Sequence, residues 1–202
     1  SFLFSFFIYG VRLYLDIGKH PKEVYIMNKY IQKYLSIEAA DYCLTRLIQD
    51  TIRYPWEKHP RVPRLVLWFS DEPYKYTGVI HPPKKMTNLI QQLVDKITAE
   101  FIDTKEYELQ GVLLNKYESG KDSVGFHADD EPELGSDPII VSISLGATRK
   151  FLMRENTTAN VETYQLSHGD LFIMGRGCQK KFKHSIPKEP QVRGIRINIT
   201  IR

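Results

Sequence analysis

The chain has 202 residues, which is enough for one domain with a proper core and too few for two full ones. Its composition, 42% hydrophobic and 26% charged, is that of an ordinary globular protein and excludes a low-complexity or disordered chain. A net charge of +4 and a pI near 8.9 would suit a polyanionic partner, but so small an excess does not establish one.

The chain begins with a strongly apolar stretch. Arg12 and Asp16 interrupt it before it reaches the roughly 18–20 residues of a membrane span. No basic region or small-residue cleavage site marks it as a signal peptide, so we expect no membrane association. We interpret residues 1–24 as an N-terminal extension, a strand or leftover upstream segment of a fragment or processed chain, before one domain over residues 25–202.

Two helices are predicted in the first half of the chain. Ser36 can cap the first, which should end before Pro55, and Pro82-Pro83 precedes the second. Apolar residues at helical spacing should face the core. In the first helix these are Ile37, Ala40, Leu44, Leu47 and Ile48, and in the second Met86, Leu89, Ile90, Leu93, Val94, Ile97 and Phe101.

From Leu109 onward the pattern is typical of strands. Val141, Ile143 and Leu145 alternate with serines, and the segments 161–166 and 171–174 flank a predicted hairpin turn at 167–170. In the last strand four isoleucines point one way, while Arg196, Asn198, Thr200 and Arg202 point the other. Two helices followed by many short strands predict an α+β fold, a double-stranded β-helix (jelly-roll) core with the N-terminal helices packed on one sheet.

The arrangement of His127, Asp129 and His184 predicts a metal site. On an extended segment His127 and Asp129 project to the same side, and His184 can join them from a distant strand. Two imidazoles and one carboxylate are the ligands of non-haem Fe(II) oxygenases, whereas catalytic zinc more often has three His or two His and Glu. A surface His-x-Asp pair is the alternative. The remaining histidines are interpreted as ordinary surface or turn residues: His20, His59, His81 and His168.

The arginines of the last strand suit the usual co-substrate of such iron, a dicarboxylic 2-oxo acid. Fe(II), one Asp and 2-oxoglutarate together leave one formal negative charge, which a single arginine would neutralise in a buried site. A guanidinium also grips a carboxylate through two hydrogen bonds, which lysine cannot do. The alternative is that one of the two arginines is merely solvated or paired with a surface acid.

Cys43 and Cys178 are the only cysteines, far apart in sequence. We interpret them as buried thiols in a reducing compartment, which predicts an intracellular protein, nuclear or cytoplasmic.

Four motifs together resemble the AlkB family of Fe(II)/2-oxoglutarate dioxygenases, most of all its eukaryotic members that demethylate nucleic acid. The motifs are Asn115-Lys116-Tyr117, the run from His127 to Pro132, Ser142-x-Ser144-Leu145-Gly146-Ala147-x-Arg149-x-Phe151, and Arg196-x-Asn198-x-Thr200-x-Arg202. The resemblance covers roughly Tyr25 to Arg202. It implies that His127, Asp129 and His184 bind Fe(II). It also implies that Asn115, Tyr117, Arg196, Asn198, Thr200 and Arg202 hold 2-oxoglutarate.

The resemblance further implies contacts to a flipped base. Asp130 would contact the exocyclic group of the methylated base, and Tyr74, Tyr76 and, less securely, Trp56 would hold its ring. Trp and Tyr are also common core residues, so a structural role is the alternative. The segment from Glu57 to Val62 is shorter than the loop with which some relatives grip nucleic acid, which leaves single against double strands open.

The implied function is oxidative demethylation of N-alkylated bases, such as 1-methyladenine and 3-methylcytosine, in DNA or RNA. It would use O2 and 2-oxoglutarate and release formaldehyde, succinate and CO2. Two alternatives remain: the same chemistry on a protein or lipid, or a catalytically silent module that keeps the fold. We expect a monomer.

Overall fold

The structure, a computed structural model, describes residues 2–8, 11–17, 28–58, 62–76, 79–102, 107 and 109–202, with backbone alone for residues 2–8, 11–17 and Tyr76. At the start of the chain, β1 (Phe2–Ile8) and β2 (Val11–Ile17) pair antiparallel. The expected domain boundary at residues 24 and 25, and also His20 and His59, lie outside the described residues.

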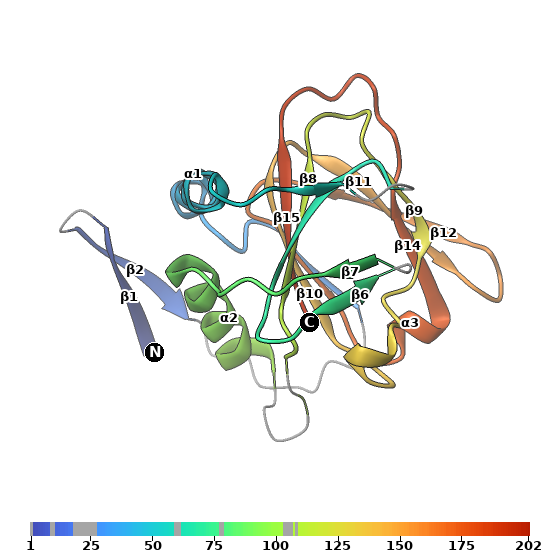
Figure 1. The fold of residues 1–202 in the computed structure, drawn as a ribbon, viewed down its shortest axis with the longest axis horizontal. Coiled ribbons are helices and arrows are strands. Elements are labelled where there is room, and N and C mark those ends of the chain that lie inside the picture. Colours follow the sequence, from blue (N-terminus) through green and yellow to red (C-terminus); the bar gives the residue numbers. More distant parts are fainter. Residues whose placement is uncertain are drawn as a thin grey trace.

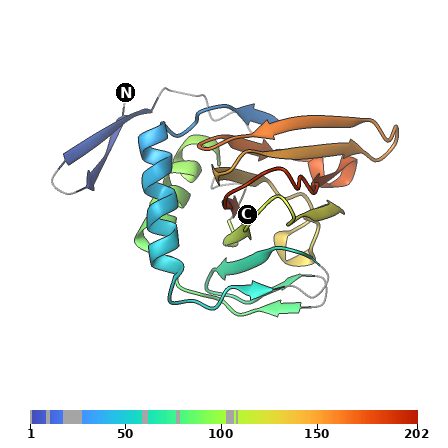
Figure 2. The same cartoon turned by 90° about the horizontal axis from the view of Figure 1, so that it is seen from above.

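Two antiparallel sheets form the body of the molecule (Figures 1 and 2). The larger has the order β3 (Lys29–Ile31), β13 (Leu171–Met174), β10 (Ile140–Gly146), β15 (Arg196–Ile201), β8 (Val112–Tyr117), β5 (Leu65–Phe69) and β4 (Glu57–Lys58). The smaller has the order β12 (Val161–Leu166), β11 (Arg149–Glu155), β14 (Phe182–Ile186) and β9 (Val124–His127). The predicted α+β jelly-roll core is therefore confirmed.

Three short elements complete the described chain. β6 (Tyr74–Tyr76) and β7 (Val79–His81) form a separate two-stranded hairpin. A 3₁₀ turn at Pro132–Leu134 follows the loop after β9, and α3 (Cys178–Lys181) precedes β14. Among the described residues, no helix is both long and apolar enough to cross a membrane.

Both predicted helices form where the sequence places them. Ser36 Oγ accepts a hydrogen bond from Ala39 N and so caps α1 (Ile37–Thr51); Thr87 Oγ1 does the same for α2 (Asn88–Phe101). Figure 2 shows both helices on one side of the strands. Their buried residues share one cluster with alternate residues of β5, β8, β10, β13 and β15, so the helices pack on the larger sheet.

The predicted buried face of α1 is partly wrong. Ile37 and Ile48 are 61% and 42% exposed, whereas Ala40, Cys43 and Leu47 are buried together with Thr51. The apolar residues of this helix extend around more than one face, so their spacing alone could not show which face the sheet covers. Small residues at positions 40 and 43 allow the close approach.

The predicted hairpin between β12 and β13 is also wrong, although both strands have the expected bounds. β12 pairs with β11 in the smaller sheet and β13 pairs with β10 and β3 in the larger, so residues 167–170 cross between the sheets. Asp170 fixes this crossing because its carboxylate accepts hydrogen bonds from Ser167 N, Lys33 N and the Tyr30 hydroxyl. Strands also occur before and between the helices, which the order of two helices followed by strands did not include.

Candidate metal centre and co-substrate cavity

The three predicted metal ligands come together on the inner side of the smaller sheet. His127 ends β9 and pairs directly with His184 on β14, and Asp129 follows two residues later. His127 Nε2 lies 3.7 Å from Asp129 Oδ1, and His184 Nε2 lies 3.7 Å from Asp129 Oδ2. All three ligand atoms lie within 4.8 Å of one another, a spacing that could hold a metal ion.

Hydrogen bonds orient two of these ligands. His127 Nδ1 lies 2.9 Å from the Gly125 carbonyl oxygen, which can only accept, so Nδ1 carries the proton and Nε2 keeps its lone pair. Asp129 N donates to Gln179 Oε1 at 2.9 Å. Such contacts behind a ligand fix its orientation before a metal binds.

Burial keeps both imidazoles neutral. It is the main reason why the pKa of His184 falls to about 3, with a further contribution from His127, and it also lowers the pKa of His127. At Asp129 burial acts in the opposite direction, but the positive charges of Arg202, above all, and of Arg64 help to lower the pKa to about 2. Two neutral imidazoles and an ionised carboxylate are the protonation states that a divalent metal requires.

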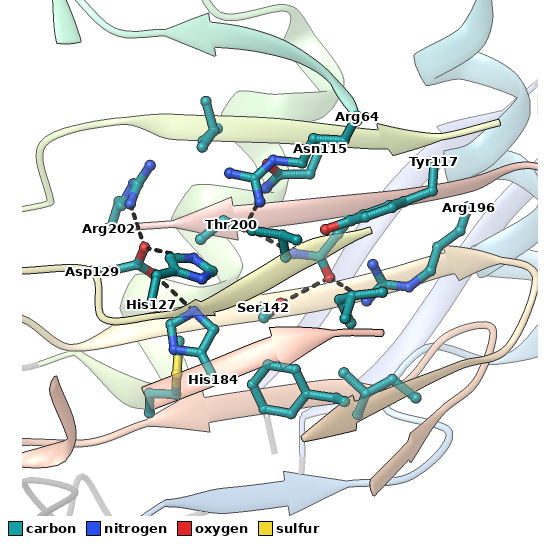
Figure 3. Close-up of a pocket in the computed structure, with 17 residues that line it drawn as sticks. Arg64, Asn115, Tyr117, His127, Asp129, Ser142, His184, Arg196, Thr200 and Arg202 are labelled. Carbon is teal, nitrogen blue, oxygen red and sulfur yellow. Dashed lines mark hydrogen bonds and ion pairs between the residues drawn. The ribbon is translucent and has the colours of Figure 1, made fainter. Parts of the chain in front are cut away.

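A cavity runs from these ligands between the two sheets (Figure 3). The metal ligands and Arg202 lie at one end, and Arg196 and Tyr117 lie at the other. The six residues expected to hold 2-oxoglutarate all line it: Asn115, Tyr117, Arg196, Asn198, Thr200 and Arg202. Strand register explains this, since Arg196 pairs with Tyr117 and Asn198 with Asn115 across β15 and β8.

The middle of the cavity is lined by a polar network. Thr200 Oγ1 accepts hydrogen bonds from Asn198 Nδ2 at 2.8 Å and from Asn115 Nδ2 at 3.1 Å. Ser142 Oγ donates to Asn198 Oδ1 at 2.9 Å. The network holds its amides in fixed directions, while Asn115 Oδ1 is buried without a hydrogen-bond partner in the described part of the chain.

Arg196 is a buried cation that suits an anionic ligand. Its Nη2 donates to Ser144 Oγ and Asn198 Oδ1, but no ion pair joins it to a carboxylate of the described residues. Its Nε is buried without a hydrogen-bond partner there, and burial lowers its pKa to about 10, still well above neutrality. A buried, charged guanidinium is costly unless paired, so a carboxylate ligand at this end would satisfy it.

Arg149 supports this end of the cavity from outside its lining. It is 1% exposed, and its guanidinium binds Glu189 Oε2 at 3.2 Å and the carbonyls of Ser119, Asp122 and Pro187. The Tyr117 ring lies against both Arg149 and Arg196, with centroid distances of 5.5 and 5.3 Å. Arg149 therefore joins two loops to the strand that positions Tyr117.

The residues expected to contact a base are placed differently. Tyr74 is 1% exposed and packs on Trp68, and its hydroxyl donates to Glu131 Oε1 at 2.7 Å. Trp56 packs on the main core beside Lys116 and is not part of the described cavity lining. Asp130 is exposed and lines a second hollow, on the other side of the metal-ligand loop. The side chain of Tyr76 lies outside the described residues.

Three cavity or near-cavity residues were missed as site residues. Arg64 and Ser142 line the cavity, and Glu131 lies near its metal-binding end through Tyr74 and Arg202. Ser142 belongs to one of the four family motifs, but it was given no role beyond its alternation with the apolar residues of β10. Arg64 follows two other basic residues, Lys58 and Arg61, in a segment where a charged side chain gives no signal that it turns inward. With it, the described lining has three arginines and one carboxylate, Asp129, which further suits a dianion.

Comparison with known proteins decides the family. The family model of the 2OG-Fe(II) oxygenase superfamily matches residues 23–202. The chain belongs to this superfamily. Within it, the predicted resemblance to the AlkB family is confirmed by the relatives.

The alpha-ketoglutarate-dependent dioxygenase alkB homolog 3 is 34% identical in Rattus norvegicus and 33% in Homo sapiens, over 84% of this chain. The DNA oxidative demethylase ALKBH2 of Bos taurus is 30% identical over 70% of it and 53% of its own length. The solved structure of OsALKBH1 has a TM-score of 0.60 at 19% identity, covering 87% of this chain and 97% of that one, which shows a shared fold. This 2OG-Fe(II) oxygenase chain spans 61% and 63% of the length of the rat and human relatives.

Proposed function

We propose that this chain is an Fe(II)- and 2-oxoglutarate-dependent demethylase of N-alkylated bases in DNA or RNA, acting on substrates of the 1-methyladenine and 3-methylcytosine type. Family membership supports the oxygenase chemistry. The printed names of the relatives, a dioxygenase of the alkB type and a DNA oxidative demethylase, support the nucleic-acid substrate.

The described residues fit both cofactors. His127, Asp129 and His184 would hold Fe(II), which together with O2 and 2-oxoglutarate supplies the oxidant for an N-methyl group. The hydroxymethyl product would release formaldehyde, while the co-substrate leaves as succinate and CO2. Arg196 would bind the carboxylate of 2-oxoglutarate at the far end of the cavity, with Tyr117 beside it.

The observation that carries the proposal is the pairing of two incomplete sites in one cavity. A metal-ligand triad lies at one end, and a buried arginine without a carboxylate partner among the described residues lies at the other. An iron-bound dicarboxylate would complete both. A binding module without catalysis would have no need for either, so its retention of both sites argues against that alternative.

The acids near the metal support a cationic substrate. Glu131 lies behind the metal-binding end and Asp130 follows Asp129 directly. A methylated adenine or cytosine that carries a positive charge would be stabilised by nearby carboxylates when it leaves water. Tyr76 stays our candidate for a base contact, whereas Asp130 faces the second hollow. Tyr74 and Trp56 better fit supporting roles, because the first is buried and the second packs on the core. A nuclear or cytoplasmic location and a monomeric state stay predictions.

The deciding experiment measures succinate release by the iron-loaded protein with a 1-methyladenine oligonucleotide, its unmethylated counterpart, or no oligonucleotide. We expect methyl-dependent succinate and formaldehyde in equal amounts, and none from Asp129→Ala. Succinate without any stimulation by methylated bases would point to a protein or lipid substrate. No succinate under any condition would point to a silent binding module.

A further inference from the structure

A second hollow lies directly behind the metal ligands. It has a volume of about 660 Å³, within the usual range for ligand pockets. Ala128 and Asp130 line it from the loop after β9, Lys183 from β14, Lys180 from α3 and Asn156 from the turn after β11. Figure 1 shows β9, β14 and α3 on the same side of the molecule.

The hollow and the metal cavity share a wall one backbone thick. Asp129 and His184 line the cavity, whereas their chain neighbours Ala128, Asp130 and Lys183 line the hollow. Successive side chains of an extended chain point to opposite sides, and neighbouring strands lie only about 5 Å apart. A ligand in the hollow is therefore about one strand away from a substrate in the cavity.

Hydrogen bonds to the backbone around α3 make the hollow a built site. Asn156 donates from its side chain to Lys180 O and from its backbone to Lys181 O, both at 2.8 Å. Asp137 Oδ1 accepts from Gly177 N at 2.6 Å, which joins the loop after the 3₁₀ turn to the start of α3. Gln179 lines the hollow and also binds Asp129 N. Its walls are thus fixed to the same groups that fix the metal ligand.

The charge of the hollow favours a phosphate. The lining of the hollow contains two lysines, Lys180 and Lys183, and one carboxylate, Asp130. No ion pair joins either lysine to an acid of the described residues. Both lysines are exposed, so they can reach a strand at the surface. Lysine binds phosphate as a point charge, and such contacts position a nucleic acid without reading its sequence.

From these observations we propose that the hollow binds the nucleotide next to the substrate base in the same strand, with Lys180 and Lys183 on its phosphate. The proposal rests on the proposed function, because the strand is the one that carries the methylated base. A base that enters the metal cavity leaves its neighbour outside, and the hollow lies one backbone away. The enzyme should then prefer a methylated base within a strand over the same base in a mononucleotide.

Binding without catalysis tests the subsite independently of the reaction. The test compares wild type with Lys180→Gln/Lys183→Gln and with a control that removes two other exposed lysines, Lys150→Gln/Lys188→Gln. The affinity for an unmethylated, fluorescent single-stranded oligonucleotide is measured over a range of salt. Each neutralised phosphate contributes about 0.7 to the slope of log K against log salt. Loss of the one phosphate that both lysines bind should therefore reduce the slope by about 0.7, and the control should leave it unchanged. Equal slopes for the two variants would overturn the proposal.

Turnover gives the second readout. Wild type should have a KM at least about tenfold lower for 1-methyladenine in a trinucleotide than in a mononucleotide, about 1.4 kcal/mol. Lys180→Gln/Lys183→Gln should lose this preference with kcat unchanged. Equal KM values for wild type would overturn the subsite while the demethylase function stands. Failure to demethylate either substrate would reject the proposed function, and the salt dependence of binding would still decide the subsite.

Discussion

Arg202 Nη1 lies 3.1 Å from Asp129 Oδ1, so the last residue of the chain forms a buried ion pair with a candidate iron ligand. Arg202 is 1% exposed, and its guanidinium also stacks on the Tyr74 ring at 4.4 Å. The pair keeps Asp129 ionised before a metal arrives, and it aims one carboxylate oxygen away from Arg202 toward His184. A metal would then meet a charged and oriented ligand.

Arg202→Met should therefore destabilise the metal-free protein strongly. Removing one partner of a buried pair costs about 3–5 kcal/mol, and we expect the lower end because Asp129 also lies near both imidazoles. Added divalent metal should recover part of the loss, since it replaces the missing positive charge. Urea unfolding with and without metal measures both effects.

The matched control is Arg46→Met, which breaks an exposed Arg–Asp pair of 3.0 Å on α1. Its free energy of unfolding should change by less than about 1 kcal/mol. If the two variants lose similar amounts of stability, the Arg202–Asp129 pair has no special role.

Arg196→Lys should raise the apparent KM for 2-oxoglutarate at least about tenfold, with a smaller effect on kcat at saturation. A lysine cannot reproduce the planar two-point contact with a carboxylate, and a hydrogen bond to a charged group is worth about 1.5–3 kcal/mol. Arg193→Lys, on the exposed loop before β15, is the control. An unchanged KM for Arg196→Lys would show that Arg202 or Arg64, and not Arg196, binds the carboxylate of 2-oxoglutarate.

Local patterns in the sequence predicted most elements, but not which strands pair. The bounds of β12 and β13 matched the pattern, yet the two strands belong to different sheets, because pairing depends on contacts with distant strands and on Asp170 at the crossing. β15 could be predicted because both of its faces are buried and differ in polarity, so that isoleucines alternate with polar residues along the strand. The role of Arg64 could not be predicted. Its side chain lines the cavity and is only 6% exposed, but nothing in a basic segment of sequence shows which side chain turns inward.

The metal triad could be assembled from sequence because iron restricts its ligands to few residue types. The residues that contact a base could not be identified in the same way. Tyr74 belongs to an aromatic motif whether it holds a base or fills the core, and only its 1% exposure and its hydrogen bond to Glu131 separate the two. Asp130 is a similar case, because it directly follows the metal ligand Asp129. Side chains alternate along this extended loop, so Asp130 points away from the metal cavity and into the second hollow.

Cys43 and Cys178 should be unreactive in the folded protein. Burial raises the pKa of each thiol to about 12, and the thiolate is the reactive form. At pH 8 only about one thiol in ten thousand would be ionised in the folded state, against roughly a quarter at an ordinary pKa of about 8.5. Labelling with a thiol-specific disulfide reagent should be slow until urea unfolds the chain.

The same shift sets the direction of a pH effect on stability. The folded protein holds the thiol protons more tightly than the unfolded chain, so this contribution is fully present below pH of about 8.5. It is lost as the pH rises toward 12. Cys43→Ala should therefore make the unfolding free energy fall less steeply in that window. Rapid labelling of both thiols under native conditions would contradict their buried placement.

Arg149→Met should weaken both the fold and the binding of 2-oxoglutarate. The guanidinium satisfies one carboxylate and three carbonyls in a buried position, so its loss should lower the free energy of unfolding by at least about 3 kcal/mol. Since the same group packs on Tyr117, the KM for 2-oxoglutarate should rise even at temperatures where the variant stays folded. Tyr117→Phe separates the two effects: it should raise the KM with little loss of stability. In the double variant the two increases in KM should be less than additive, because both act through the Tyr117 hydroxyl, which Arg149 positions and Phe lacks. A folded Arg149→Met protein with an unchanged KM would show that Arg149 holds its loops without positioning Tyr117.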